Sequence, residues 1–499
     1  MTSVFTLLAT SAAPFRPMNA VPYHVANPAA GHAAHRFGFR NSSAYFEVYS
    51  PWIESRYSEV VWRTLDAVPL PADVVAKYDG RTMAVTGFEV NVERGEGADA
   101  RDVPVYESYN HHYVSFIHGA GAALHPDDVG ARNRADLRFV PTSNTAGAAD
   151  VPHVQAFSEH NGNECRQTYH GLPAPYVQPI HSPRTWQIGV MQINTLSPDG
   201  PGHRGGPLPA ASAAPPGAAY SGILECPCTT RVVKNVSAGT INGRPFRPNC
   251  TRDAWVSDLY AKGNPTCDVS TYVGGMECCK DGDVLLDADQ EVPPHVDRVR
   301  YRWRFYHEEF APVKAKHVPV FHLEWAVNGC DSGGPGGNPK NCQHIEYDVQ
   351  RAADGTPPAE QVHTVTSHFK VRDMMAPNCS VATDFYCADE AIAERRGGVQ
   401  LIMAGGHCHS PSCLSLELYN DDTNELLCAI TPSMGTGDAP MDETDYLWLP
   451  PCQWGEEDPA LRPPPKLGLD TKLRTVKRAN SSVHHYGVMG IWQMRGAYL

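Results

Sequence analysis

The sequence predicts a mainly β protein made of two jelly-roll-like β-sandwich domains with long loops and few short helices. The 499 residues include 42 glycines and 43 prolines, which favours many turns between short strands. Long helical periodicities are scarce, whereas several short segments alternate apolar and polar residues. A chain of this length exceeds what one hydrophobic core usually supports, so we expect two domains.

The expected elements fall into two groups along the chain. The clearest strand is 299–305, where apolar residues alternate with Arg300, Arg302 and Arg304. This alternation predicts one buried face and one solvent-exposed face. Further strands are expected at 83–92, 103–117, 318–327, 399–404, 414–419 and 488–494, and a short helix at 71–77 that ends before Gly80.

These elements suggest a division of the chain near residue 296. We expect a tail or weak signal segment at 1–40, a first β domain at 41–296 with a cysteine-rich insertion, and a second β domain at 297–499. The stretch from Cys226 to Cys279 is compatible with either side of the boundary. Segments 197–219 and 333–339 are rich in Pro, Gly or Ala and are expected to be long surface loops.

Cysteine usage indicates an oxidising, extracellular environment. The 15 cysteines include clusters at 226–228, 278–279 and 408–413, as in a disulfide framework, although their spacing assigns no pairs. Residues 4–13 resemble a short signal-peptide core with a small-residue cleavage site but lack a basic start. A secreted glycoprotein is also consistent with five Asn-x-Ser/Thr sites, at Asn41, Asn235, Asn249, Asn378 and Asn480.

Charge and hydropathy limit the classes of partner. The net charge of -14 argues against nucleic acids and anionic membrane surfaces, which would be repelled. No apolar run approaches the about 20 residues needed to cross a bilayer. We therefore expect a small-molecule or peptide substrate, no nucleic acid and no membrane span.

His407 and His409 form the better of two candidate metal sites. Residues two apart on a strand point the same way, so both imidazoles can bind one ion while Cys408 faces the opposite layer. A thioether from Met489 or Met494 on the last strand would favour copper over zinc. The alternative is a pair of hydrogen-bonded or exposed histidines and a core methionine.

The second candidate site is His111-His112. Neighbouring strand residues face opposite sides, so they share one metal only if the backbone bulges. Nearby apolar and aromatic residues place them on a buried strand, where imidazoles need partners. His170 is the preferred third ligand. The other possibilities are His118, His153, His160 and His181, while His322 is either a further ligand or a hydrogen-bonded core histidine.

Several segments resemble the stress up-regulated nodulin family of plants and microbes. They include Ala44 to Pro51, Tyr109-Asn110-His111-His112-Tyr113 and Ala404-Gly405-Gly406-His407-Cys408-His409, and the likeness covers nearly the whole chain. The resemblance implies kinship, but the family carries no defined activity to transfer.

A more distant resemblance is to the copper type II, ascorbate-dependent monooxygenases related to peptidylglycine hydroxylase. That family carries His-His plus a later His in one sandwich, and His-x-His plus Met in the next. The order is the same here, although the gap between the two motifs is longer. The resemblance implies two copper ions, with ascorbate as reductant and O2-dependent hydroxylation of a small organic or peptide substrate. The implied ligands are His111, His112 and His170 for one copper and His407, His409 and Met489 for the other.

Two other functions fit the same histidines. One is a non-catalytic extracellular metal-binding stress protein. The other is a zinc hydrolase with one occupied site and an open water position.

Overall fold

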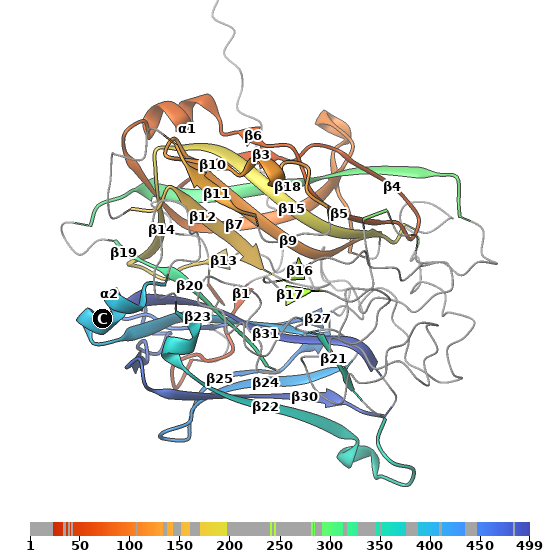
Figure 1. Ribbon diagram of the computed structural model, residues 1–499, viewed down its shortest axis with the longest axis vertical. Helices are drawn as coiled ribbons and strands as arrows, with labels where there is room; N and C mark the ends of the chain where they lie inside the picture. Colours follow the sequence, from red (N-terminus) through yellow and green to blue (C-terminus); the bar gives the residue numbers. More distant parts are fainter. Residues whose placement is uncertain are drawn as a thin grey trace, which may run out of the picture.

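The protein is mainly β, as the sequence predicts, and its sheets are almost entirely antiparallel (Figure 1). The expected loops at 197–219 and 333–339, the signal-like segment at 4–13 and almost all of the region between Cys226 and Cys279 lie outside the described residues. The computed structural model describes residues 23–32, 36–37, 40, 43–105, 107–132, 137–142, 151–159, 170–196, 240–241, 244–245, 281–282, 284, 292–312, 317–327, 346–349, 351–375, 388–408, 412–434, 447–482 and 485–499.

Two sheets form the N-terminal sandwich, which occupies the upper part of Figure 1. The larger sheet has the order β19-β14-β7-β18-β3, with β8 and β13 on β7 and β4 on β18. Its strands are β3 (Ala44–Tyr49), β4 (Ile53–Arg56), β7 (Thr82–Arg94), β8 (Arg101–Asp102), β13 (His170–Gly171), β14 (Tyr176–His181), β18 (Val296–Glu309) and β19 (Val318–Pro319). The smaller sheet has the order β12-β9-β15-β5, with β6 on β15, and comprises β5 (Val60–Thr64), β6 (Val68–Pro69), β9 (Ser108–Gly119), β12 (Val154–Glu159) and β15 (Pro183–Asn194).

Aromatic side chains from both sheets fill the interior of this sandwich. Trp303 of β18 is fully buried and lies with its ring centroid 5.1 Å from those of Phe88 on β7 and Tyr113 on β9. Trp186 of β15 completes the contact from the smaller sheet at 6.0 Å. These contacts hold the two sheets face to face, because large apolar side chains contribute most of the buried area between them.

Two further sheets form the C-terminal sandwich, in the lower part of Figure 1. One has the order β20-β31-β23-β28, with β21 on β31 and β29 on β23, and the other has the order β22-β30-β24-β25. The strands are β20 (Phe321–Ala326), β21 (Glu346–Val349), β22 (Val362–Lys370), β23 (Val399–Cys408), β24 (Cys413–Asn420), β25 (Glu425–Ile430), β28 (Cys452–Gln453), β29 (Lys466–Leu467), β30 (Lys472–Asn480) and β31 (His485–Tyr498). Two disulfides, Cys408–Cys413 and Cys428–Cys452, belong to this sandwich.

Helices are few and short among the described residues, again as predicted. Helix α1 (Ala72–Lys77) follows Pro71, and Gly80 just beyond it has a positive φ of 64°. Helix α2 (Glu390–Arg396) begins where Asp389 accepts a hydrogen bond from the Ile392 amide and ends at a left-handed glycine. The remaining described elements include four 3-10 turns, at Gly97–Asp99, Pro126–Asp128, Pro358–Glu360 and Val371–Met374. Four pairs of short strands complete them: β1 (Tyr23–His24) with β2 (Arg36–Phe37), β10 (Ala122–Leu124) with β11 (Phe139–Pro141), β16 (Thr240–Ile241) with β17 (Arg244–Pro245), and β26 (Ser433–Met434) with β27 (Leu447–Trp448).

Strand β18 differs from its prediction in two respects. It pairs with β3 and β7, so it joins strands of the predicted first domain rather than those of the second. Its arginine face is not solvent-exposed, because Arg302 and Arg304 are only 3% and 1% exposed. Neighbouring strands supply carboxylates instead: the Arg304 guanidinium lies 2.5 Å from Glu47 on β3, and Arg302 lies 3.7 Å from Glu93 on β7. Alternation alone could not reveal that both faces of a central strand are covered.

The two sandwiches meet through a short connection. Strand β19 pairs in parallel with β14, and after Val320 the chain continues as β20 in the C-terminal sandwich. Val320 packs in a small buried cluster with Tyr176 of β14 and Ile402 of β23. Across the same junction, the Gln453 side chain donates a hydrogen bond of 2.7 Å to the carbonyl of Gly171.

Candidate metal centres

His111 occupies a β-bulge. Strand β9 pairs His112 with Met191 and Asn110 with Gln192, so His111 is the extra residue between two consecutive partners on β15. Sequence analysis predicts that His111 and His112 can bind the same metal only if the backbone bulges between them. The structure has a bulge at that position. The side chain of His112 lies outside the described residues.

The surroundings of His111 keep its imidazole neutral. The side chain is 2% exposed and lies edge-on to Tyr109, with ring centroids 5.6 Å apart. Burial lowers the pKa of His111 to about 4, because the low-dielectric interior disfavours the charged ring. A neutral imidazole is the form that binds transition metals.

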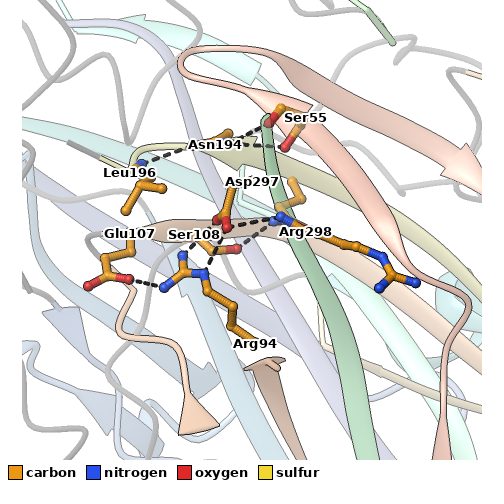
Figure 2. Close-up of polar contacts among 9 residues, drawn as sticks. Ser55, Arg94, Glu107, Ser108, Asn194, Leu196, Asp297 and Arg298 are labelled. Carbon is orange, nitrogen blue, oxygen red and sulfur yellow. Dashed lines mark hydrogen bonds and ion pairs between the residues drawn. The ribbon is translucent and has the colours of Figure 1, made fainter. Parts of the chain in front are cut away.

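Ion pairs anchor the beginning of β9 to the larger sheet (Figure 2). Arg94, at the end of β7, binds both carboxylate oxygens of Asp297 on β18, at 2.7 and 2.6 Å. Its remaining nitrogen lies 2.5 Å from Glu107, which directly precedes β9. Sequence reasoning missed this cluster, because Asp297 is 203 residues from Arg94 in the chain and only the pairing of β18 with β7 brings them together.

Side-chain amides hold β15, the strand next to β9 in the smaller sheet, to β9 and β4. The amide of Gln192 donates a 2.5 Å hydrogen bond to the hydroxyl of Ser108. Two positions further along, Asn194 donates to the carbonyl of Ser55 at 3.0 Å and to its hydroxyl at 3.2 Å (Figure 2). Buried polar contacts therefore fix both strands on the side of the bulge where β9 begins.

The structure separates three possible third ligands from His111. His118 lies seven residues along the same strand, which corresponds to about 23 Å. His153 and His181 are near that far end of β9, because the carbonyl of His153 accepts a hydrogen bond from Gly119 and the carbonyl of Ser182 accepts one from Ala120. No imidazole spans such a distance, so these three histidines are not ligands of a metal at His111. His160 lies outside the described residues.

His170 remains the candidate third ligand. It begins β13, pairs with Phe88 on β7 and stacks at a tilt on that ring, with centroids 4.7 Å apart. It is 9% exposed and lies beside the aromatic core of the N-terminal sandwich. Within the described ranges, however, no three His, Cys, Asp or Glu side chains are grouped in a way that could hold a metal.

In the C-terminal sandwich, His407 and Met489 lie on one face of a sheet. Strand β23 pairs His407 with Ile491 of β31, and cross-strand partners share a face. Met489 is two residues before Ile491 and therefore points to the same side. His407 is 1% and Met489 5% exposed. His409 lies outside the described residues.

Cys408 faces the opposite layer, as predicted. It packs in the core between the two sheets and is bonded to Cys413. Met494 belongs to this same core cluster, whereas Met489 does not. The alternation along β31 thus separates the two methionines that the sequence left open, and only Met489 shares the face of His407.

His322 is a hydrogen-bonded histidine. Its Nε2 lies 2.9 Å from Glu324, and its Nδ1 lies 2.6 Å from the guanidinium of Arg495. Both ring nitrogens are engaged, so of the two readings of His322 the structure favours the hydrogen-bonded one. These three residues lie on the polar face of the β20-β31-β23 sheet, further along from His407.

Comparisons with known proteins assign neither a family nor a function to this chain. A scan against models of known families finds no match, and neither does a search of curated proteins. Within the part of the chain that the structure describes, no helix is long and apolar enough to span a membrane.

Proposed function

We propose that the chain is a secreted copper-binding protein whose principal site consists of His407, His409 and Met489. The observation that carries this proposal is the shared face of His407 and Met489 on adjacent antiparallel strands. Side chains diagonally across such a pair are within reach of one ion, particularly when one of them is a long thioether. The two disulfides are consistent with an oxidising compartment.

The donor set favours copper. Zinc in proteins is bound by cysteine, histidine and carboxylate side chains, and magnesium by oxygen atoms, whereas a methionine thioether beside two imidazoles preferentially binds Cu(I). The pairing of β23 with β31 continues through His407 to Cys408, so the backbone of His407 is fixed relative to that of Met489. Both side chains are almost fully buried, at 1% and 5% exposed.

A second copper site would use His111, His112 and His170. The bulge at His111 supports this assignment, because it relieves the opposed orientation of neighbouring strand residues. Copper bound at these two sites would supply one-electron and O2 chemistry, with ascorbate as reductant and a small organic or peptide substrate. The protein's own residues would hold and orient the ligands and exclude water.

Copper stoichiometry and affinity test the principal site. Met489→Leu should weaken Cu(I) binding by about tenfold or more and Cu(II) binding less, because only the thioether is lost. Met494→Leu is the matched control: it lies on the same strand, faces the core and should bind as the wild type does. His407→Ala should remove one copper per chain, and His111→Ala should remove the other.

Several outcomes would contradict the proposal. Equal Cu(I) affinity for Met489→Leu and Met494→Leu would exclude Met489 as a ligand. Tight binding of one zinc ion that His407→Ala or His111→Ala abolishes, with no copper bound, would favour the zinc hydrolase instead. Copper binding without ascorbate-dependent O2 consumption, measured with candidate peptides and small organic substrates, would identify a metal-binding protein that does not turn over.

A further inference from the structure

Three chain segments meet at the end of β9 that lies away from His111. Backbone hydrogen bonds join them: the amide of Gly119 donates to the His153 carbonyl at 2.7 Å, and that of His181 donates to the Pro152 carbonyl at 2.9 Å. The amide of Ala120 donates to Ser182 at 3.0 Å. The backbones that carry His153 and His181 are therefore fixed relative to one another.

Two glycines make this close approach possible. A Cβ atom on Gly119 would collide with the backbone carbonyl of His181, and one on Gly121 would collide with the imidazole of His153. The imidazole of His153 consequently fills the space that any side chain at position 121 would take. Glycine at both positions keeps the two histidines together.

The two imidazoles have the separation expected of metal ligands. Their ring centroids are 5.2 Å apart and their planes are nearly perpendicular, at 81°. With metal–nitrogen bonds of about 2.0 Å and a tetrahedral angle, two ligating imidazoles have centroids about 5 Å apart. The observed spacing thus leaves room for one ion between them.

His153 has nitrogen atoms available for such an ion. It is 1% exposed, and neither of its ring nitrogens has a hydrogen-bond partner among the described residues. Buried polar groups normally have partners, so a bound ligand would account for this one. In His181, the Nδ1 atom lies 3.4 Å from the hydroxyl of Thr82, which leaves Nε2 for coordination.

We propose that His153 and His181 form a two-histidine site for a divalent transition metal ion such as Zn²⁺. Two water molecules complete a tetrahedral shell, since no third His, Cys, Asp or Glu side chain within the described ranges joins the pair. Burial lowers the pKa of both histidines, so each is neutral and able to bind metal at neutral pH. The site is independent of the proposed copper sites, because it lies at the opposite end of β9 from His111.

Zinc stoichiometry of matched variants tests this site. Wild-type protein should bind one more Zn²⁺ per chain than His153→Gln or His181→Gln, and the double variant should lose no more than either single variant. His118→Gln is the control, because His118 is a partly buried histidine near the same end of β9 whose Nδ1 lies 3.1 Å from the Ala122 carbonyl. It should retain the wild-type stoichiometry. Equal zinc binding by all variants would overturn the proposal.

A measurement on wild-type protein tests the site even if the variants do not fold. Zn²⁺ should protect His181, which is 9% exposed, from modification by diethyl pyrocarbonate, as mapped by peptide mass spectrometry. The ring of His125 is 29% exposed and should react equally with and without zinc. Unchanged modification of His181 at saturating Zn²⁺ would refute the site even if the variants fail to fold.

Discussion

Replacing Asp297 by alanine should destabilise the N-terminal sandwich by about 3 kcal/mol. The change removes both short contacts to Arg94, at 2.7 and 2.6 Å, in a setting where the side chains are only 14% and 6% exposed. Breaking a buried ion pair by removing one partner costs about 3 to 5 kcal/mol, because a charge is left without compensation. Glu107 still binds Arg94 at 2.5 Å, so the lower end of that range applies.

Urea unfolding followed by tryptophan fluorescence measures this loss as a lower free energy of unfolding. The neighbouring Arg298→Ala is the control: the Arg298 side chain is 51% exposed and its ion pairs with Glu54 and Glu96 are 3.6 and 3.8 Å long. An exposed pair contributes about 1 kcal/mol or less. A double-mutant cycle with Arg94→Met should give a coupling energy of about 2 kcal/mol. Additive costs, or an Asp297→Ala loss no larger than that of Arg298→Ala, would refute the reasoning.

Three further changes test the packing and electrostatics of the fold. Burial lowers the pKa of His307 to about 4, so the folded protein binds the proton less readily than the unfolded chain. The free energy of unfolding should therefore fall by about 3 kcal/mol as the pH drops from 6.5 to 4. His307→Gln should remove this part of the pH dependence, measured by urea unfolding at a series of acidic pH values. Replacing Cys428 and Cys452 by serine removes a disulfide between residues 24 apart. The unfolded chain then gains conformational entropy, which should lower the free energy of unfolding by about 3.5 kcal/mol. A lower urea midpoint would show this loss, and an unchanged midpoint would contradict it. Gly490→Ala would place a methyl group 2.5 Å from Val327, so calorimetry should show a destabilisation of about 1 to 3 kcal/mol; a variant as stable as wild type would mean that the core adjusts freely.

The sequence located many of the strands of the fold. The expected strand at 83–92 corresponds to β7 (Thr82–Arg94), and the one at 399–404 extends further, as β23 (Val399–Cys408). Alternation predicts such elements because each strand must bury one face. The same rule predicted that His407 and Cys408 face opposite layers, as the core contact of Cys408 confirms.

The sequence did not reveal which strands pair. Strand β18 carries arginines whose carboxylate partners, such as Glu47 and Glu93, are more than 200 residues away. Local alternation reports only that one face is apolar. Whether the polar face meets water or carboxylates depends on its neighbours in the sheet, and that is decided by long-range pairing.

By itself, the sequence determined the mainly β class, many of its strands and the histidine motifs, since each of these depends on residue type and local spacing. Tertiary structure decided which histidines can act together. It separated His118, His153 and His181 from His111, placed Met489 rather than Met494 on the face of His407, and brought His153 beside His181. The physical reason is that a shared ligand requires side chains within a few ångströms in space, and strand register, not sequence distance, sets that separation.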